Sequence, residues 1–96
     1  MRKRNTEHIG DVIRQFLKQK NLEKPLNEKR LVDAWPEVLG SSIMNYTTKI
    51  YVKRKILFVT INSAVLRNDL FLTRQNIVQS LNNHVGAHVI DDIVFS

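Results

Sequence analysis

The stretch Lys53-Arg-Lys-Ile-Leu-Phe-Val-Thr-Ile-Asn-Ser-Ala-Val-Leu-Arg-Asn-Asp-Leu70 decides the fold of this chain. It opens with three consecutive cations and continues into the longest apolar run of the sequence, Ile56–Val59. β-Branched and aromatic residues dominate that run, which predicts a central strand. Ser63 follows the strand and offers a hydroxyl that can accept from a free backbone N–H, so it is a candidate helix N-cap. The stretch therefore predicts a basic turn, a buried strand and a capped helix.

The residues after Ser63 carry an apolar pattern with a helical period. It predicts one helix from Ser63 to about Asn83, with a stripe that consists of Leu66, Leu70, Thr73, Ile77 and Leu81. Further apolar residues flank this stripe on both sides, so a second helix is expected to pack beside it. Gly86 is expected to end the helix, and His88–Phe95 is predicted to form the last strand.

The residues before the stretch supply its partner strand. Strands are predicted over Thr47–Lys53 and Lys55–Ile61. A hairpin loop with an even number of residues gives one face Ile50, Val52, Leu57, Val59 and Ile61. The other face then holds Lys49, Tyr51, Lys53, Ile56, Phe58 and Thr60. The turn lacks the Asn-Gly or Asp-Gly of a tight type I′ hairpin, so we expect a looser loop that presents Arg54.

The N-terminal half is predicted to hold two helices. Residues 5–20 have the spacing of an amphipathic helix, residues 21–26 are read as a connector, and a second helix is predicted over residues 27–39. Pro36 lacks an N–H, so the second helix must kink there or restart. The only tryptophan, Trp35, is predicted to be a core residue.

The element order is therefore ααββαβ, with a short helical turn expected over Ser41–Tyr46. This order predicts an α+β fold, a three-stranded mixed sheet with helices on one face, in which the last strand lies parallel to the second. Residues 1–6 are expected to form a flexible basic arm, and residues 7–96 one globular domain.

The composition is typical of a small folded domain. Hydrophobic residues make up 43% of the 96 residues and charged residues 25%, with three glycines and two prolines. There is no cysteine, so disulfides and thiolate metal sites are excluded. No apolar run exceeds four residues, which argues against a transmembrane helix or a signal sequence. We expect a cytoplasmic protein without membrane contact.

Motifs for catalysis and metal binding are missing from the sequence. It has no Walker loop, no G-x-S-x-G and no H-E-x-x-H. His84 and His88 lie four residues apart, but no carboxylate stands at ligand spacing. Asp91 and Asp92 are adjacent, and neighbouring strand residues point to opposite faces. We expect no enzyme activity, no metal and no cofactor.

The charge points to a polyanionic partner. Fifteen Lys and Arg against nine Asp and Glu give a net charge of +6 and a pI near 10.0. Cations beside aromatic rings are what single-stranded nucleic acid requires, and one hairpin carries Lys49, Tyr51, Lys53, Arg54, Lys55 and Phe58. Further candidate residues are Arg67, Arg74, Arg2, Lys3 and Arg4. The alternatives are charge that serves solubility alone, and a solvated sheet face with Phe58 covered by a chain end.

Several segments resemble the DciA family of bacterial proteins. The resemblance is carried by Trp35-Pro-Glu-Val-Leu-Gly40 and by Ile56–Leu70, with further matches at Leu81-Asn82, Gly86 and Val89–Phe95. It extends from about Ile9 to Phe95. It implies a fold like a type II K-homology domain, binding to DNA, and a role in loading or stimulating the replicative helicase.

Two features depart from what the resemblance implies. K-homology domains hold the nucleic-acid backbone with a G-x-x-G loop, which this sequence lacks. Larger family members carry a C-terminal tail implicated in helicase contact, whereas this sequence ends at Ser96. We therefore expect helicase contact through the globular domain or the N-terminal arm. Two other functions stay open: a K-homology-like RNA-binding module, and a protein–protein adaptor with an acidic partner.

Overall fold

The structure, a computed structural model, describes residues 23–96. Its elements are α2 (Glu23–Leu39), the 3₁₀ helix η1 (Ser41–Asn45), β1 (Thr47–Lys53), β2 (Ile56–Ile61), α3 (Ala64–Leu72), α4 (Arg74–Val85) and β3 (Asp92–Phe95). The predicted α+β class and the short helical turn before β1 are confirmed. The predicted basic arm and the predicted helix over residues 5–20 lie outside the described residues.

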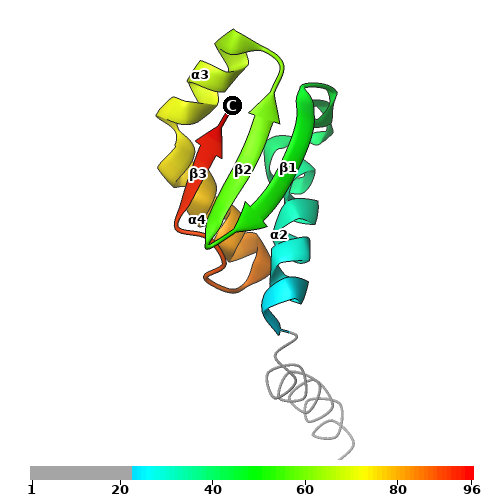
Figure 1. Ribbon diagram of the computed structural model, residues 1–96, viewed down its shortest axis with the longest axis vertical. Helices are drawn as coiled ribbons and strands as arrows, with labels where there is room; N and C mark the ends of the chain where they lie inside the picture. Colours follow the sequence, from blue (N-terminus) through cyan, green and yellow to red (C-terminus); the bar gives the residue numbers. More distant parts are fainter. Residues whose placement is uncertain (1–22) are drawn as a thin grey trace, which may run out of the picture.

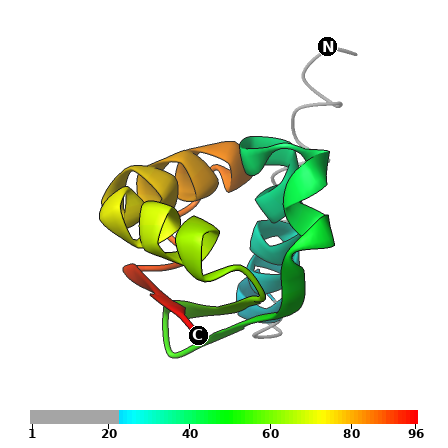
Figure 2. The ribbon, with the colours of Figure 1, turned by 90° about the horizontal axis from the view of Figure 1, so that it is seen from above.

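The central strand of the sheet is β2. It pairs with β1 in antiparallel orientation and with β3 in parallel orientation, so the predicted mixed sheet is confirmed. The helices α2, α3 and α4 lie together on one side of this sheet, and none of them lies on the other side (Figures 1 and 2). This one-sided arrangement positions the candidate site described below.

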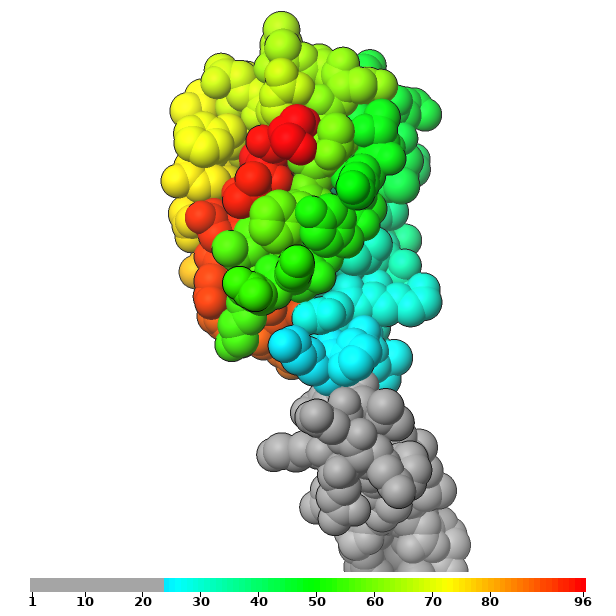
Figure 3. Space-filling model, in the orientation of Figure 1, coloured from blue at the N-terminus to red at the C-terminus, as the bar shows by residue number. Residues whose placement is uncertain are grey.

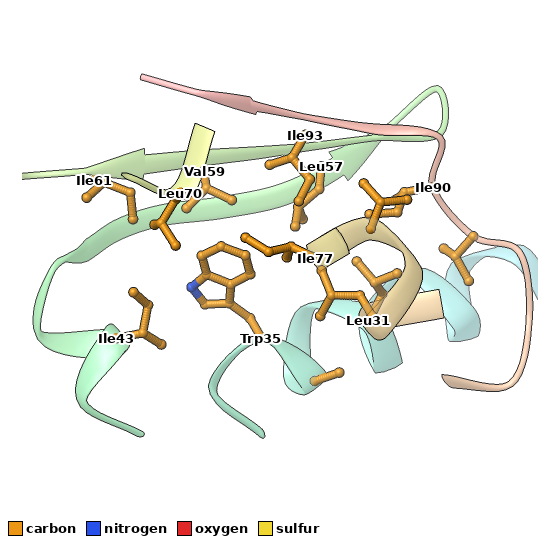
Figure 4. Close-up of a cluster of buried hydrophobic side chains, with 14 residues drawn as sticks. Leu31, Trp35, Ile43, Leu57, Val59, Ile61, Leu70, Ile77, Ile90 and Ile93 are labelled. Atoms are coloured by element: carbon orange, nitrogen blue, oxygen red, sulfur yellow. The ribbon is translucent and has the colours of Figure 1, made fainter. Parts of the chain in front are cut away.

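The core fills the space between the sheet and the helices. Leu57, Val59 and Ile61 alternate along β2 and are at most 1% exposed. Trp35 of α2 lies beneath the sheet, at the centre of this cluster (Figure 4), and is fully buried as predicted. Its indole Nε1–H donates a hydrogen bond of 3.1 Å to the Thr47 hydroxyl. The one polar atom of the tryptophan is therefore satisfied inside the core.

The β1–β2 hairpin has the predicted register but not the predicted loop. Tyr51 pairs with Phe58 and Lys53 with Ile56, so Arg54 and Lys55 alone form the turn. Both have positive φ, 54° and 64°, which is the backbone signature of a type I′ turn. The expected looser loop is therefore wrong. A type I′ turn favours Asn-Gly because these residues adopt positive φ at low cost, but other residues can adopt it at a higher cost.

The predicted single helix after Ser63 is two helices. The Ser63 hydroxyl caps α3 as expected, because it accepts from the Leu66 N–H at 3.3 Å. Thr73 then separates α3 from α4, with φ of −109° and ψ of 16°. Its hydroxyl lies 3.4 Å from the Asp69 and Leu70 carbonyl oxygens, where it competes with the helical hydrogen bonds. The apolar period continues across Thr73, so periodicity alone does not reveal this break.

Two boundaries in the N-terminal half also differ from the prediction. Helix α2 begins at Glu23, so residues 23–26 of the predicted connector are helical. It continues through Pro36 without interruption, which makes a restart at Pro36 wrong. Gly40 follows the helix with φ of 96°, and its N–H donates to the Pro36 carbonyl at 2.9 Å.

The last strand is shorter than predicted, Asp92–Phe95 instead of His88–Phe95. Val89 and Ile90 are consecutive and both buried, which a strand with one covered face cannot achieve. The Asn82 side chain of α4 binds this segment instead. It accepts from the N–H groups of Val89 and Ile90 at 2.9 and 3.1 Å and donates to the Ile90 carbonyl at 2.9 Å. Gly86, in the left-handed region, ends α4 as predicted.

Candidate nucleic-acid interface

The side of the sheet opposite the helices carries a pair of aromatic rings. We call this side the open face; from β1 and β2 it contains Lys49, Tyr51, Lys53, Ile56, Phe58 and Thr60. The rings of Tyr51 and Phe58 stack with their centroids 5.1 Å apart and an angle of 14° between their planes. Tyr51 is 40% exposed and Phe58 is half-buried. The predicted pairing of these aromatic residues on one face is therefore present.

Four cations surround the aromatic pair. Lys49 and Lys53 precede and follow Tyr51 on the same side of β1, and Arg54 and Lys55 form the turn. All four are exposed, and none forms a salt bridge with any residue of 23–96. The Lys49 ammonium lies over the Tyr51 ring, 5.4 Å from its centroid. This group of four residues, the hairpin cations, is available to an external anion.

The third strand, β3, completes the open face, and the carboxylate that it contributes is already paired. Val94 pairs with Phe58 and is 42% exposed. Asp92 pairs with Ile56, but its carboxylate accepts from the Ile93 N–H at 2.8 Å and lies 3.3 Å from the Arg74 guanidinium. In the space-filling view all three strands lie at the surface, and no helix of the described residues 23–96 covers them (Figure 3). A flat ligand therefore has access to the aromatic pair from solvent.

Arg67 and Arg74 do not belong to this surface arrangement. Both were named as candidate residues, but they lie in two different helices, α3 and α4, on either side of the break at Thr73. The Arg67 guanidinium donates to the Ile61 carbonyl at 2.7 Å and so ties α3 to the end of β2. Arg74 lies over the Phe71 ring, 4.2 Å from its centroid, and pairs with Asp92. Both arginines have structural partners within the domain. Arg2, Lys3 and Arg4 lie outside the described residues.

Sequence reasoning did not single out Lys24, which lies near the turn in the structure. Lys24 lines a hollow of about 260 Å³ together with Lys55 and His88. Glu28 lines the same hollow, and His88 is paired with Asp91, so the charges here are nearly balanced. We therefore leave this hollow outside the interface. Lys24 and Lys55 are far apart in the sequence, and no local sequence pattern predicts that they lie close together.

Neither a metal site nor a membrane span is found in the described part of the chain. Within residues 23–96, no three His, Asp or Glu side chains are grouped so that they could hold a metal ion. The helices of this region also lack the combination of length and hydrophobicity that a bilayer crossing requires.

The fold and the open face define a small α+β domain with an aromatic and basic sheet surface. Comparison with known families identifies which domain this is. The family described as "Dna[CI] antecedent, DciA" matches residues 8–95. The chain belongs to the DciA family, as the Trp35–Gly40 segment and the β2–α3 junction predicted.

A curated relative has a similar sequence. The "UPF0232 protein" of Corynebacterium glutamicum (strain R) is 24% identical to this chain over 90 residues. The matched region covers 94% of this chain and 51% of the relative. The chain thus spans about half the length of this relative.

Proposed function

We propose that this protein is a non-enzymatic, cytoplasmic accessory factor of DNA replication that binds single-stranded DNA on its open face and acts with the replicative helicase. Family membership supports the connection with replication and the helicase. The aromatic and basic residues of the open face support single-stranded DNA as the ligand. We further propose that the fold is of the type II K-homology kind, in agreement with the observed mixed sheet and the helices on one face.

The observation that carries this proposal is the stacked Tyr51–Phe58 pair among four cations that have no salt-bridge partner within residues 23–96. Phe58 covers one face of the Tyr51 ring, so a base stacks on what remains accessible of the pair. Each stacked base contributes about 1–3 kcal/mol. Tyr51 stays 40% exposed, so its ring is accessible to a ligand. Base stacking is the contact that an accessible ring beside cations favours.

The hairpin cations take the part that a G-x-x-G loop plays in K-homology domains. Such a loop holds the nucleic-acid backbone, and this chain has none. Lys49, Lys53, Arg54 and Lys55 lie close enough to the rings to contact the phosphates of a strand whose bases stack there. Recognition of this kind depends on charge and ring faces and therefore does not distinguish one base sequence from another.

The test is a parallel binding experiment with single-stranded DNA, RNA of the same sequence, duplex DNA and purified replicative helicase. For single-stranded DNA, three to four phosphate contacts give a slope of log affinity against log salt of about −2 to −3. Fluorescence anisotropy across a salt series measures it. Affinity that ignores salt contradicts the proposal, and preference for RNA over DNA assigns the open face to an RNA-binding module.

A protein–protein adaptor is the second candidate, and one observation favours it. Helix α3 exposes three apolar side chains, Val65 at 75%, Leu72 at 72% and Phe71 at 48%. Apolar exposure of this extent on one short helix is typical of a protein contact. Val65→Ser/Leu72→Ser would then abolish helicase binding while single-stranded DNA binding persists. The matched change Asn68→Ser/Asn76→Ser, at exposed polar positions of α3 and α4, would leave both unchanged.

A further inference from the structure

The turn of the β1–β2 hairpin combines backbone strain with positive charge. Among residues 23–96, Arg54 and Lys55 are the only non-glycine residues with positive φ. They are consecutive, and both are cations. Residues other than Gly, Asn and Asp adopt this backbone region at a higher cost in free energy, because Cβ approaches the carbonyl oxygen. Asn-Gly would form the same two-residue turn with less strain.

The structure around the turn holds this strained conformation in place. Lys53 and Ile56 pair directly on either side of it, so the turn cannot lengthen without a loss of strand pairing. The Lys55 carbonyl also accepts from the Asp91 N–H at 2.7 Å, which ties the turn to the segment before β3. The turn is thus fixed from two directions, and its side chains extend from a rigid base. Strain of this kind persists where the surrounding structure enforces it, and such sites are often functional.

We propose that the Arg54–Lys55 turn is a preformed phosphate clamp. An Asn-Gly turn would make the folded domain more stable, whereas Arg54 and Lys55 place two cations at a fixed position of the backbone. The inference rests on the proposed function and adds that the two turn cations contact phosphodiesters of the bound strand from a backbone that is already fixed before binding. Two cations on a fixed turn backbone bind without ordering a flexible loop, so less backbone entropy is lost on binding than with the looser loop that the sequence indicates. The clamp reads charge alone and so acts on single strands, duplexes and heparin alike.

Two double variants separate strain from charge. Arg54→Asn/Lys55→Gly removes both the charges and the strain, and Arg54→Gln/Lys55→Gln removes the charges but retains the strain. We expect the Asn-Gly variant to melt about 4–8 °C above the wild type, the shift typical of a modest gain in a domain of this size. The Gln-Gln variant is expected to melt close to the wild type. Both variants are expected to bind oligothymidylate and heparin more weakly, with a salt slope for oligothymidylate reduced by about 1.4 for two lost phosphate contacts.

The melting temperatures and affinities of the two variants support or overturn the clamp. Equal weakening of both variants, with a higher melting temperature for the Asn-Gly variant alone, supports the clamp. Equal melting temperatures overturn the claim that stability is sacrificed. Binding like that of the wild type overturns the clamp. In that case the Tyr51→Ala/Phe58→Ala variant tests the proposed function separately. Loss of oligothymidylate binding without loss of heparin binding would support base stacking on the open face even though the clamp is wrong.

Discussion

The two faces of the sheet are built from the same three strands and differ in almost every physical respect. On the covered face, Leu57, Val59 and Ile93 are at most 2% exposed and pack around Trp35. On the open face, Tyr51 and Val94 are at least 40% exposed, and cations stand beside the ring. Successive residues of a strand point to opposite faces, so each strand serves both purposes at once.

This difference separates residues that stabilise from residues that are available for binding. Removing a buried side chain costs its transfer free energy plus the cavity that it leaves. An exposed side chain contributes little to folding, so substitution on the open face changes stability only slightly. Large apolar side chains that stay exposed beside cations on the open face are therefore candidates for contact with a partner. Substitutions on each face test this difference.

The largest expected effect lies at the centre of the covered face. Trp35→Ala should lower the free energy of unfolding by about 3–5 kcal/mol, a large share of the ~5–15 kcal/mol typical of a domain. The urea midpoint followed by circular dichroism measures it. Trp35→Phe is the control, because it keeps much of the apolar volume and loses the hydrogen bond to Thr47. A midpoint that hardly moves for Trp35→Ala would refute the assignment of this residue to the core.

Two adjacent residues of β3 provide the sharpest test of the two faces. Ile93 is 2% exposed and lies on the covered face, whereas Val94 is 42% exposed and lies on the open face. Ile93→Ala should cost about 2–4 kcal/mol of stability, and Val94→Ala less than about 1 kcal/mol. Chemical denaturation of both variants gives the difference. Equal losses would mean that the open face is covered in solution.

The aromatic pair of the open face should affect binding more than folding. Tyr51→Ala/Phe58→Ala should weaken the binding of single-stranded DNA by about 1–3 kcal/mol for each stacked base that is lost. Heparin has no bases, and in duplex DNA the bases are already stacked, so both should be affected far less. Binding is compared by anisotropy. Val94→Ala is the matched control, because it removes an apolar side chain from the same face without removing a ring.

A folding check belongs with the aromatic variant. Phe58 is half-buried, and stacked aromatic pairs contribute about 0.5–1.5 kcal/mol, so a modest loss of stability is expected. The circular dichroism spectrum at the binding temperature must match that of the wild type. If the folded variant binds single strands as tightly as the wild type, base stacking is wrong, and the hairpin cations alone account for any affinity.

Most of the fold could be predicted from the sequence, because burial leaves a periodic pattern. The alternation along β1 and β2 gave the register, and the open face followed from it. Trp35 and the Ser63 cap were predicted for the same kind of local reason. The break at Thr73 could not be predicted, because the apolar stripe continues through it. The early end of β3 depends on the side chain of Asn82, which makes contacts seven and eight residues further along the chain.

The candidate site could be predicted in part. The aromatic and basic residues of the hairpin were named from alternation and charge. The tight turn was missed, because Asn-Gly is the sequence that forms a type I′ turn with the least strain but is not the only sequence that forms one. Arg67 and Arg74 were grouped with the site on charge alone, whereas their partners, the Ile61 carbonyl and Asp92, are brought near them by tertiary structure. Charge in a sequence does not reveal which cations are already paired.

The smallest expected effect distinguishes two lysines of the open face. Both Lys49→Gln and Lys53→Gln should make the salt slope for single-stranded DNA shallower by about 0.7, the value for one phosphate contact. Lys49 differs because its ammonium lies over the Tyr51 ring, where it competes with an incoming base. At high salt, where phosphate contacts contribute little, Lys49→Gln should therefore bind at least as tightly as Lys53→Gln. Anisotropy titrations of both variants at several salt concentrations measure this difference. Tighter binding by Lys53→Gln at high salt would show that the Lys49 ammonium supports stacking rather than competing with it.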